Sequence, residues 1–171
     1  LTINRALEMI YPTDENPITI HFTEGTFAPS TTGEIYSIIM ISNISMIGAG
    51  PDFTILDAEQ SGRVITMNDI YNVSISRLTV TGGFPQGNYY TDAIGGGVFA
   101  RRSIAQLNRV AITDNKAWSQ GKGFYAKASE LDMYNVTILN NTASEVGSCP
   151  YCWYYSTLAI VNTIIWENEL F

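Results

Sequence analysis

An eleven-residue pattern that recurs along the chain constrains its fold more than any other feature. Apolar residues occupy positions i, i+2, i+5 and i+7 of this pattern, and position i+10 is Gly or Asn. A step of two keeps side chains on one face of a strand, whereas the step of three predicts a bend. Each copy therefore predicts two short strands that turn around a shared core, as in one coil of a solenoid. Copies begin at Val73, Ala105, Leu131 and Leu158, and a weaker one is assigned to Ile39, Ile41, Ile44 and Met46.

Two further elements complete the predicted coil stack. The segments 95–100 and 121–126 start with Gly and continue with apolar residues, which predicts another strand in each coil. Near the N-terminus, Leu1, Ile3, Leu7 and Ile10 follow helical spacing, which predicts a short helix that caps the first apolar layer. We expect an all-β, single-stranded parallel β-helix with an N-terminal capping helix.

The predicted domain organisation is a single β-helix domain over residues 1–171. Residues 1–38 form the N-terminal cap and first coil, and residues 39–171 form the stacked coils. No cap is visible after the last copy, so we expect either a C-terminal truncation, with further coils in the natural protein, or a second subunit on the open coil. Since Leu1 is neither an initiator Met nor the start of a signal peptide, the chain is expected to be processed or excised from a longer one.

The residue at position i+10 has a structural interpretation. Asn tolerates a left-handed backbone, and its amide can bond to the same group one coil away. A stacked ladder is predicted for Asn115, Asn141 and Asn168, without a functional role for any of them.

Several segments of the sequence resemble those of a known protein family. The segments Ile55–Asp57, Gly62–Met67 and Val73–Gly83 resemble secreted bacterial β-helix repeat proteins with a pectate-lyase-like fold. The Gly-Gly-Gly-Val and Ile-x-x-Asn elements are similar to repeats of polymorphic outer-membrane proteins. The resemblance implies a right-handed β-helix, and it leaves activity open because this fold carries lyases, hydrolases and adhesins.

Charge and hydrophobicity exclude two classes of partner. Charged residues make up 15% of the chain and the formal net charge is −7, so no basic stripe for nucleic acid is expected. No apolar run is long enough to cross a bilayer, so membrane insertion is not expected.

The loops that follow each copy are predicted to lie on one face of the solenoid. Aromatic rings beside carboxylates suit stacking on sugars and hydrogen bonding to their hydroxyls. The alternative is that these rings cover the coil edges and shield the backbone. The candidate ligand-binding residues are Phe84, Tyr89, Tyr90, Asp92, Asp114, Trp118, Tyr151 and Trp153, with Glu145 nearby.

No catalytic set is evident in the sequence. A polysaccharide lyase needs a base and a metal or a cationic group, and a hydrolase needs two facing carboxylates. Asp92 and Asp114 could converge, and Arg101, Arg102 and Arg109 lie in the same coils, but no dense acidic cluster is present. We predict no catalytic residue, no metal site and no cofactor. Calcium binding is left open, although no motif supports it.

The Cys149-Pro150-Tyr151-Cys152 segment matches the motif of glutaredoxin-like oxidoreductases, which place it at a helix start in a βαβ unit. Such a unit is not predicted here. A small loop disulfide between the two cysteines fits better, in an oxidising compartment. A zinc site is not predicted, because His21 is the only His and lies far away in the chain.

The sequence therefore predicts an extracellular or cell-surface module that presents a loop face to a polysaccharide or a surface protein without catalysis. A carbohydrate-active enzyme, most plausibly a lyase, is the first alternative. The second is a structural protein that assembles head to tail through its open C-terminal coil.

Overall fold

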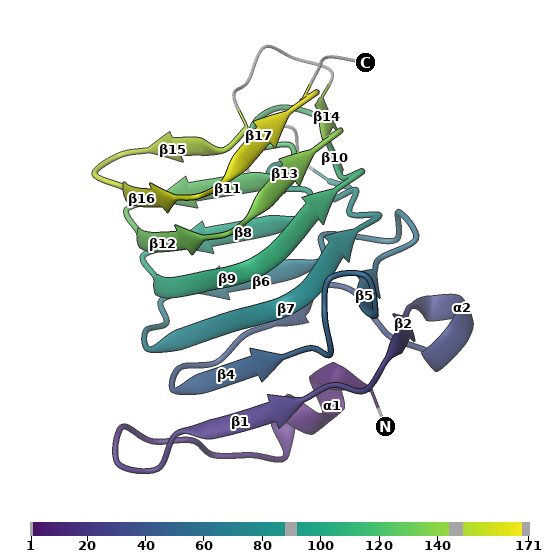
Figure 1. Cartoon of the computed structure of the whole chain (residues 1–171), viewed down its shortest axis with the longest axis vertical. Helices are drawn as coiled ribbons and strands as arrows, with labels where there is room; N and C mark the ends of the chain where they lie inside the picture. The colour runs from purple at the N-terminus through teal and green to yellow at the C-terminus, as the bar shows by residue number, and fades with distance from the viewer. Residues whose placement is uncertain (1, 88–91, 144–148, 169–171) are drawn as a thin grey trace.

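The coils stack in parallel into a right-handed β-helix of about five turns, as the computed structural model shows for residues 2–87, 92–143 and 149–168 (Figure 1). Strands from successive coils pair side by side, so each sheet runs along the axis of the solenoid. The expected fold class is confirmed.

Three sheets form the walls. The ten-stranded sheet contains β1 (Ile18–His21), β2 (Gly25–Phe27), β4 (Ile44–Ile47), β5 (Thr54–Asp57), β7 (Val73–Thr81), β9 (Ile104–Thr113), β12 (Glu130–Tyr134), β13 (Thr137–Leu139), β16 (Thr157–Val161) and β17 (Ile164–Trp166). The five-stranded sheet contains β3 (Ile38–Ile39), β6 (Ile65–Asn68), β8 (Val98–Arg101), β11 (Phe124–Lys127) and β15 (Tyr151–Trp153). A short pair is formed by β10 (Lys116–Ala117) and β14 (Thr142–Ala143).

The repeated apolar positions stack one above another, as the pattern predicts. Val80 pairs with Ile112, Ile112 with Ile138, and Ile138 with Ile165. The predicted bend falls on one residue per coil that adopts a left-handed backbone. These residues occupy position i+4 of each copy and are Arg77, Arg109, Asn135 and Asn162.

The assignment of the weaker first copy is wrong in register. Ile44 pairs with Val73, so Ile44 occupies position i of its coil rather than i+5. Ile39 belongs to β3 of the other sheet and is 55% exposed. The pattern is hidden there because residues 48–53 separate β4 from β5, whereas later coils turn at a single left-handed residue.

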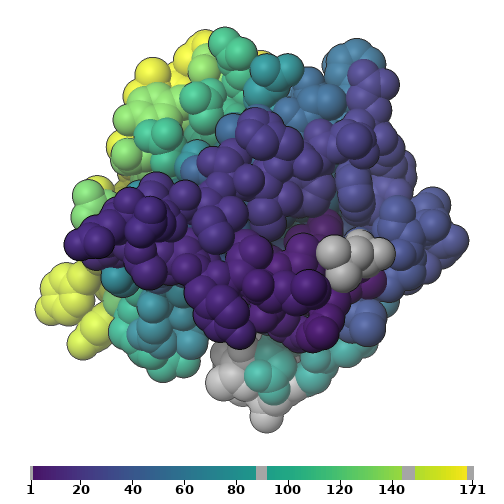
Figure 2. All heavy atoms as spheres, turned by 90° about the horizontal axis from the view of Figure 1, so that it is seen from below, coloured from purple at the N-terminus to yellow at the C-terminus, as the bar shows by residue number. Residues whose placement is uncertain are grey.

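Helix α1 (Ile3–Glu8) covers the first layer of the core, as expected. Ile3 and Leu7 are buried in the same apolar cluster as the coils. The buried carboxylate of Glu34 accepts a hydrogen bond of 2.9 Å from the Ile3 N–H, which satisfies a donor at the helix start. Figure 2 shows the N-terminal segments lying across this end of the solenoid. A second short helix, α2 (Pro29–Thr32), lies beside the first coil.

The last coil differs because its inward positions face solvent. Ile160 and Ile165 continue the core column but are 44% and 40% exposed. The segment 116–120, expected to be a loop, begins instead with β10, which pairs with β14. Within the described part of the chain, neither helix has the length and apolar character of a membrane span.

Candidate functional site

Two columns of side chains project outward from the five-stranded sheet, and the more exposed one carries most of the chemistry. Register places Asn68, Arg101, Lys127 and Trp153 beside one another on consecutive coils. We call these four residues the basic strip. Trp153 is 50% exposed, and Asn68 and Arg101 are also exposed.

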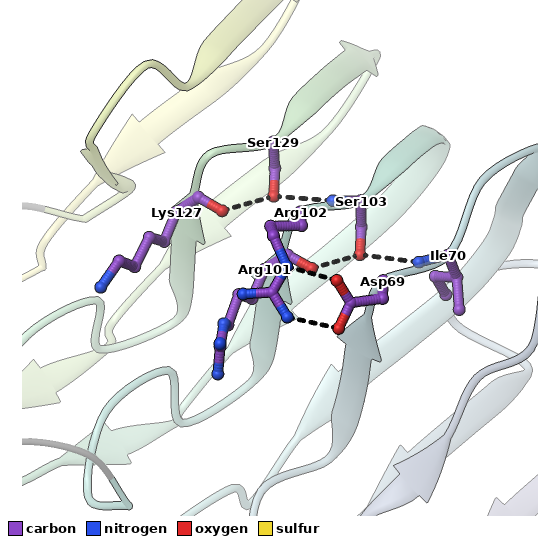
Figure 3. Close-up of polar contacts among 7 residues, drawn as sticks. All are labelled: Asp69, Ile70, Arg101, Arg102, Ser103, Lys127 and Ser129. Atoms are coloured by element: carbon purple, nitrogen blue, oxygen red, sulfur yellow. Dashed lines mark hydrogen bonds and ion pairs between the residues drawn. The ribbon is translucent and has the colours of Figure 1, made fainter.

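Strand alternation puts this column outside. In β8, Val98 and Ala100 point into the core while Phe99 and Arg101 point away from it, and β11 repeats the arrangement one coil further on. Neighbouring strands lie about 4.8 Å apart, so Arg101 and Lys127 are a little less than 5 Å apart at the backbone. Figure 3 shows both side chains extending to the same side of the sheet.

Lys127 and Trp153 contact each other directly. The Lys127 Nζ lies 4.3 Å from the centroid of the Trp153 ring, within range of a cation–π interaction. Because the ammonium is attracted to the ring face without being neutralised, the end of the basic strip combines a positive charge with an exposed aromatic surface.

The corner beside the basic strip holds one ion pair. Arg102 donates hydrogen bonds through Nε and Nη2 to the two carboxylate oxygens of Asp69 (Figure 3). These hydrogen bonds hold the pKa of the Asp69 carboxyl below its usual value. The charge of Arg102 is thereby balanced, whereas no ion pair neutralises Arg101 or Lys127 among the residues described.

A serine ladder fixes the backbone where the basic strip meets this corner. Ser103 Oγ donates to the Arg101 carbonyl at 2.8 Å, and Ser129 Oγ donates to the Lys127 carbonyl at 2.9 Å. The Ser103 N–H in turn donates to Ser129 Oγ at 3.1 Å (Figure 3). Ser156 Oγ continues the column by donating to the Trp153 carbonyl. The three serines therefore anchor three of the four residues of the basic strip.

The second outward column is aromatic and largely covered. Phe99, Tyr125 and Tyr151 stack nearly parallel, with ring centroids 5.4 and 5.6 Å apart. Tyr125 is only 2% exposed, and rings stacked face to face offer their edges rather than their faces. This column supports the sheet rather than offering a platform for sugar rings.

Arg63 closes the aromatic column at its lower end. Its guanidinium lies 4.6 Å from the Phe99 ring centroid and donates hydrogen bonds to the carbonyls of Asp92, Ile94 and Gly95. Burial lowers the pKa of Arg63 to about 10. The residue therefore ties the segment 92–95 to the preceding coil.

The structure divides the predicted loop face into two separate groups. Phe84 and Trp118 contact each other with ring centroids 5.6 Å apart. Tyr151 and Trp153 lie instead on the five-stranded sheet, in the aromatic column and the basic strip respectively. Tyr89, Tyr90 and Glu145 lie outside the described residues.

Asp92 and Asp114 accept hydrogen bonds from different residues. The Asp92 backbone carbonyl accepts a hydrogen bond from Arg63, while Asp114 accepts one from the Asn140 side chain. Arg109 turns the bend within β9 and belongs to the coil geometry.

The three ladder residues are joined by their amides. Asn115 Nδ2 donates to Asn141 Oδ1 at 3.0 Å, and Asn141 Nδ2 donates to Asn168 Oδ1 at 2.9 Å. Asn115 and Asn141 are fully buried. Their side chains also bond backbone groups, which accounts for them structurally.

The expected loop disulfide is absent: Cys149 and Cys152 are free thiols. Residues Tyr151–Trp153 run extended in β15, whereas a disulfide needs Cα atoms within about 7 Å and so favours a turn between its cysteines. Among the described residues, no group of three His, Cys, Asp or Glu side chains is arranged to hold a metal ion.

Sequence reasoning missed Lys127, the serine ladder and a polar groove. A Ser two residues after both Arg101 and Lys127 was the signal in the sequence from which the ladder could have been predicted.

The polar groove lies on the outward face of the ten-stranded sheet and has a volume of about 280 Å³. Its lining includes Ser74, Gln106, Glu130 and Asp132.

Comparison with known proteins finds likeness in structure alone. No protein family and no curated protein matches the sequence. A mutant pectin methylesterase in complex with a hexasaccharide has a TM-score of 0.55 and 12% identity over 97% of this chain and 62% of its own length. A second pectin methylesterase–hexasaccharide complex has a TM-score of 0.50 and 12% identity over 95% of this chain and 61% of its own.

A candidate glycosyl hydrolase from Parabacteroides merdae has a TM-score of 0.52 and 14% identity, over 95% of this chain and 88% of its own length. At such identities the likeness shows the fold. The class defined by this fold is the right-handed parallel β-helix, and this chain spans less than two thirds of the two esterases.

Proposed function

We propose that the protein is a secreted or cell-surface module that binds an acidic polysaccharide along the basic strip without cleaving it. The observation that carries this proposal is the register of Arg101, Lys127 and Trp153 on one exposed face. A polymer that lies along the solenoid axis would meet one of these side chains per coil. The spacing is comparable to the length of one sugar unit.

Charge distribution supports an anionic ligand. The chain has a formal net charge of −7, yet Arg101 and Lys127 project together from one face with no ion pair among the described residues. Cationic side chains can bond carboxylate groups, and the exposed face of Trp153 can stack on a sugar ring. That two structural neighbours were solved with hexasaccharides supports testing carbohydrates first.

The test is isothermal titration calorimetry with oligomers of galacturonic acid and matched oligomers of galactose, which lack the carboxylate. We expect the acidic oligomers to bind more tightly, and the double variant Arg101→Ala/Lys127→Ala to lose about tenfold or more in affinity. Gln106→Ala, on the other sheet, is the matched control and should bind like the parent protein. Equal binding of both oligomers, or full affinity of the double variant, would refute the proposal.

A polysaccharide-cleaving enzyme is the second candidate, because Glu130 and Asp132 both line the groove on the ten-stranded sheet. Two carboxylates on one face are the minimum that a glycoside hydrolase requires. Release of reducing ends that disappears in Glu130→Gln would establish hydrolysis, and unsaturated products would establish a lyase.

Head-to-tail assembly has less support. The open coil exposes Ile160 and Ile165, but α1 covers the apolar layer that a stacked copy would need at the other end. Size-exclusion chromatography across a concentration series tests assembly, and growth into filaments would favour it. A surface protein as partner is an alternative to the polysaccharide at the basic strip.

A further inference from the structure

Strand β15 carries two residues of the outward columns and contains or adjoins both cysteines of the chain. Tyr151 stacks on Tyr125 and Trp153 contacts Lys127, while Cys152 lies between them and Cys149 precedes the strand. The conformation of this one strand therefore places the Trp153 ring on the proposed binding face and the Tyr151 ring in the aromatic column beside it.

The two thiols lie in different surroundings. Cys149 is half buried against the core, and its Sγ accepts a hydrogen bond of 3.3 Å from the Gly123 N–H of the neighbouring coil. Cys152 is exposed and is in register with the buried Ala126. Since Ala126 points into the core, strand pairing turns Cys152 toward the interior side of its own coil, the side on which Cys149 also packs.

A bond between these sulfurs is chemically accessible but incompatible with β15 as it stands. The Cys149 sulfur is bonded at Gly123 and Cys152 pairs with Ala126, so the two cysteines lie three residues apart along β11, roughly 10 Å in an extended chain. A disulfide needs Cα atoms within about 7 Å, so the chain must turn more tightly between residues 149 and 152. Such a turn would withdraw Cys149 from Gly123 and break the parallel pairing of Tyr151 and Trp153 with β11.

We propose that Cys149 and Cys152 form a thiol–disulfide exchange site that a small disulfide such as oxidised glutathione oxidises, and that this oxidation releases β15 from the binding face. The consequence for ligand binding rests on the function proposed above, whereas the change in β15 does not. The reduced protein is the state that binds.

The exchange proceeds in two balanced steps. The Cys152 thiolate attacks one sulfur of oxidised glutathione, which forms a mixed disulfide and expels one glutathione thiolate. The Cys149 thiolate then attacks the Cys152 sulfur, which forms the internal disulfide and expels the second. The two protein thiols lose two electrons to the glutathione disulfide, and their two protons go to the two expelled thiolates.

The exposure of Cys152 makes it the thiol that reacts first, and the raised pKa values make both thiols slow to react near neutral pH. Burial raises the pKa of the Cys152 thiol, and it raises that of Cys149 despite opposing hydrogen bonds from the Gly123 and Phe124 amides. Because only the thiolate reacts, the exchange rate should rise with pH through the range in which these thiols ionise.

The experiment compares the protein kept in reducing buffer with protein equilibrated in oxidised glutathione. Mass spectrometry should show the loss of two hydrogen atoms and an internal disulfide in the oxidised sample. Near-ultraviolet circular dichroism should show loss of the signals of the stacked Tyr125–Tyr151 pair and of Trp153. Affinity for acidic oligosaccharide should fall about tenfold, as expected when the cation–π contact and the Trp153 surface are lost.

Cys149→Ser and Cys152→Ser are the matched controls. Cys152→Ser should form little adduct, Cys149→Ser should stop at the mixed disulfide, and both should keep the reduced spectrum after the adduct is removed with dithiothreitol. Failure to form the internal disulfide, or an internal disulfide with an unchanged spectrum, would overturn the inference. A protein that binds no acidic glycan but loses the spectrum on oxidation would refute only the proposed function.

Discussion

The outward faces of the two large sheets are built on the same coil but carry opposite chemistry. On the ten-stranded sheet, one register column reads Ser45, Ser74, Gln106 and Asp132. On the five-stranded sheet, the column of the basic strip contains two cations and an indole. Beneath both faces the side chains are buried and apolar. The comparison shows that the buried core determines where each outward column lies, whereas the residues in those columns are free to differ. The functional groups of this protein are therefore brought together from successive coils and not from neighbouring positions in the sequence.

The largest expected effect tests whether both outward faces depend on the same buried interior. Asn141→Ala should lower the free energy of unfolding by about 2–4 kcal/mol, because Asn115 and several buried backbone groups lose hydrogen-bond partners. Urea denaturation measures the change. Asn140→Gly, one residue away and exposed, is the control, because Gly keeps the left-handed backbone of Asn140, and it should cost far less. Equal costs would mean that the buried ladder is not what holds the coils in register.

The next effect tests the support beneath the five-stranded sheet. Arg63→Ala removes the contact with Phe99 and the hydrogen bonds to the carbonyls of segment 92–95, and should destabilise the protein by about 2 kcal/mol. Thermal unfolding should show the loss, whereas Arg5→Ala in the exposed helix pair should change little. A melting temperature unchanged in Arg63→Ala would show that the aromatic column needs no such support.

Charge reversal on each face tests which of the two sheets binds the ligand. Lys127→Glu should weaken binding of an acidic oligosaccharide about tenfold or more, because one attraction becomes a repulsion at the basic strip. Asp132→Lys places a new positive charge on the other face and should not weaken binding. If both variants lose affinity equally, the ligand is not confined to the five-stranded sheet.

The smallest effect concerns the ion pair at the corner. Asp69→Asn frees the positive charge of Arg102 beside the basic strip, so affinity for an acidic ligand should rise about twofold at low salt and return to the parent value at high salt. Its melting temperature should stay unchanged, since exposed ion pairs contribute little to stability. Isothermal titration calorimetry at two ionic strengths measures the change in affinity. Weaker binding by Asp69→Asn would indicate that Asp69 itself contacts the ligand.

The sequence was sufficient to predict the coils of the solenoid, but not to predict which residues lie together on its outward faces. Apolar periodicity identified the strands that pair in register, because burial repeats in every coil. It failed for the first copy, where residues 48–53 break the spacing. Trp153 was found as an aromatic residue, while Lys127 was missed because its relation to Arg101 exists only once strands from different coils are aligned.

The segment 48–53 has a consequence for how such a chain can change over time. It adds several residues at a corner where later coils use one, yet Ile44 and Met46 still pair with Val73 and Ile75. The longer corner leaves the strand register unchanged because it is bonded to the next coil, where Arg77 donates to the Ala49 carbonyl and Thr79 to the Pro51 carbonyl. New loops can accumulate at these corners one at a time, and a foreign peptide grafted between β4 and β5 should be displayed without disturbing the wall.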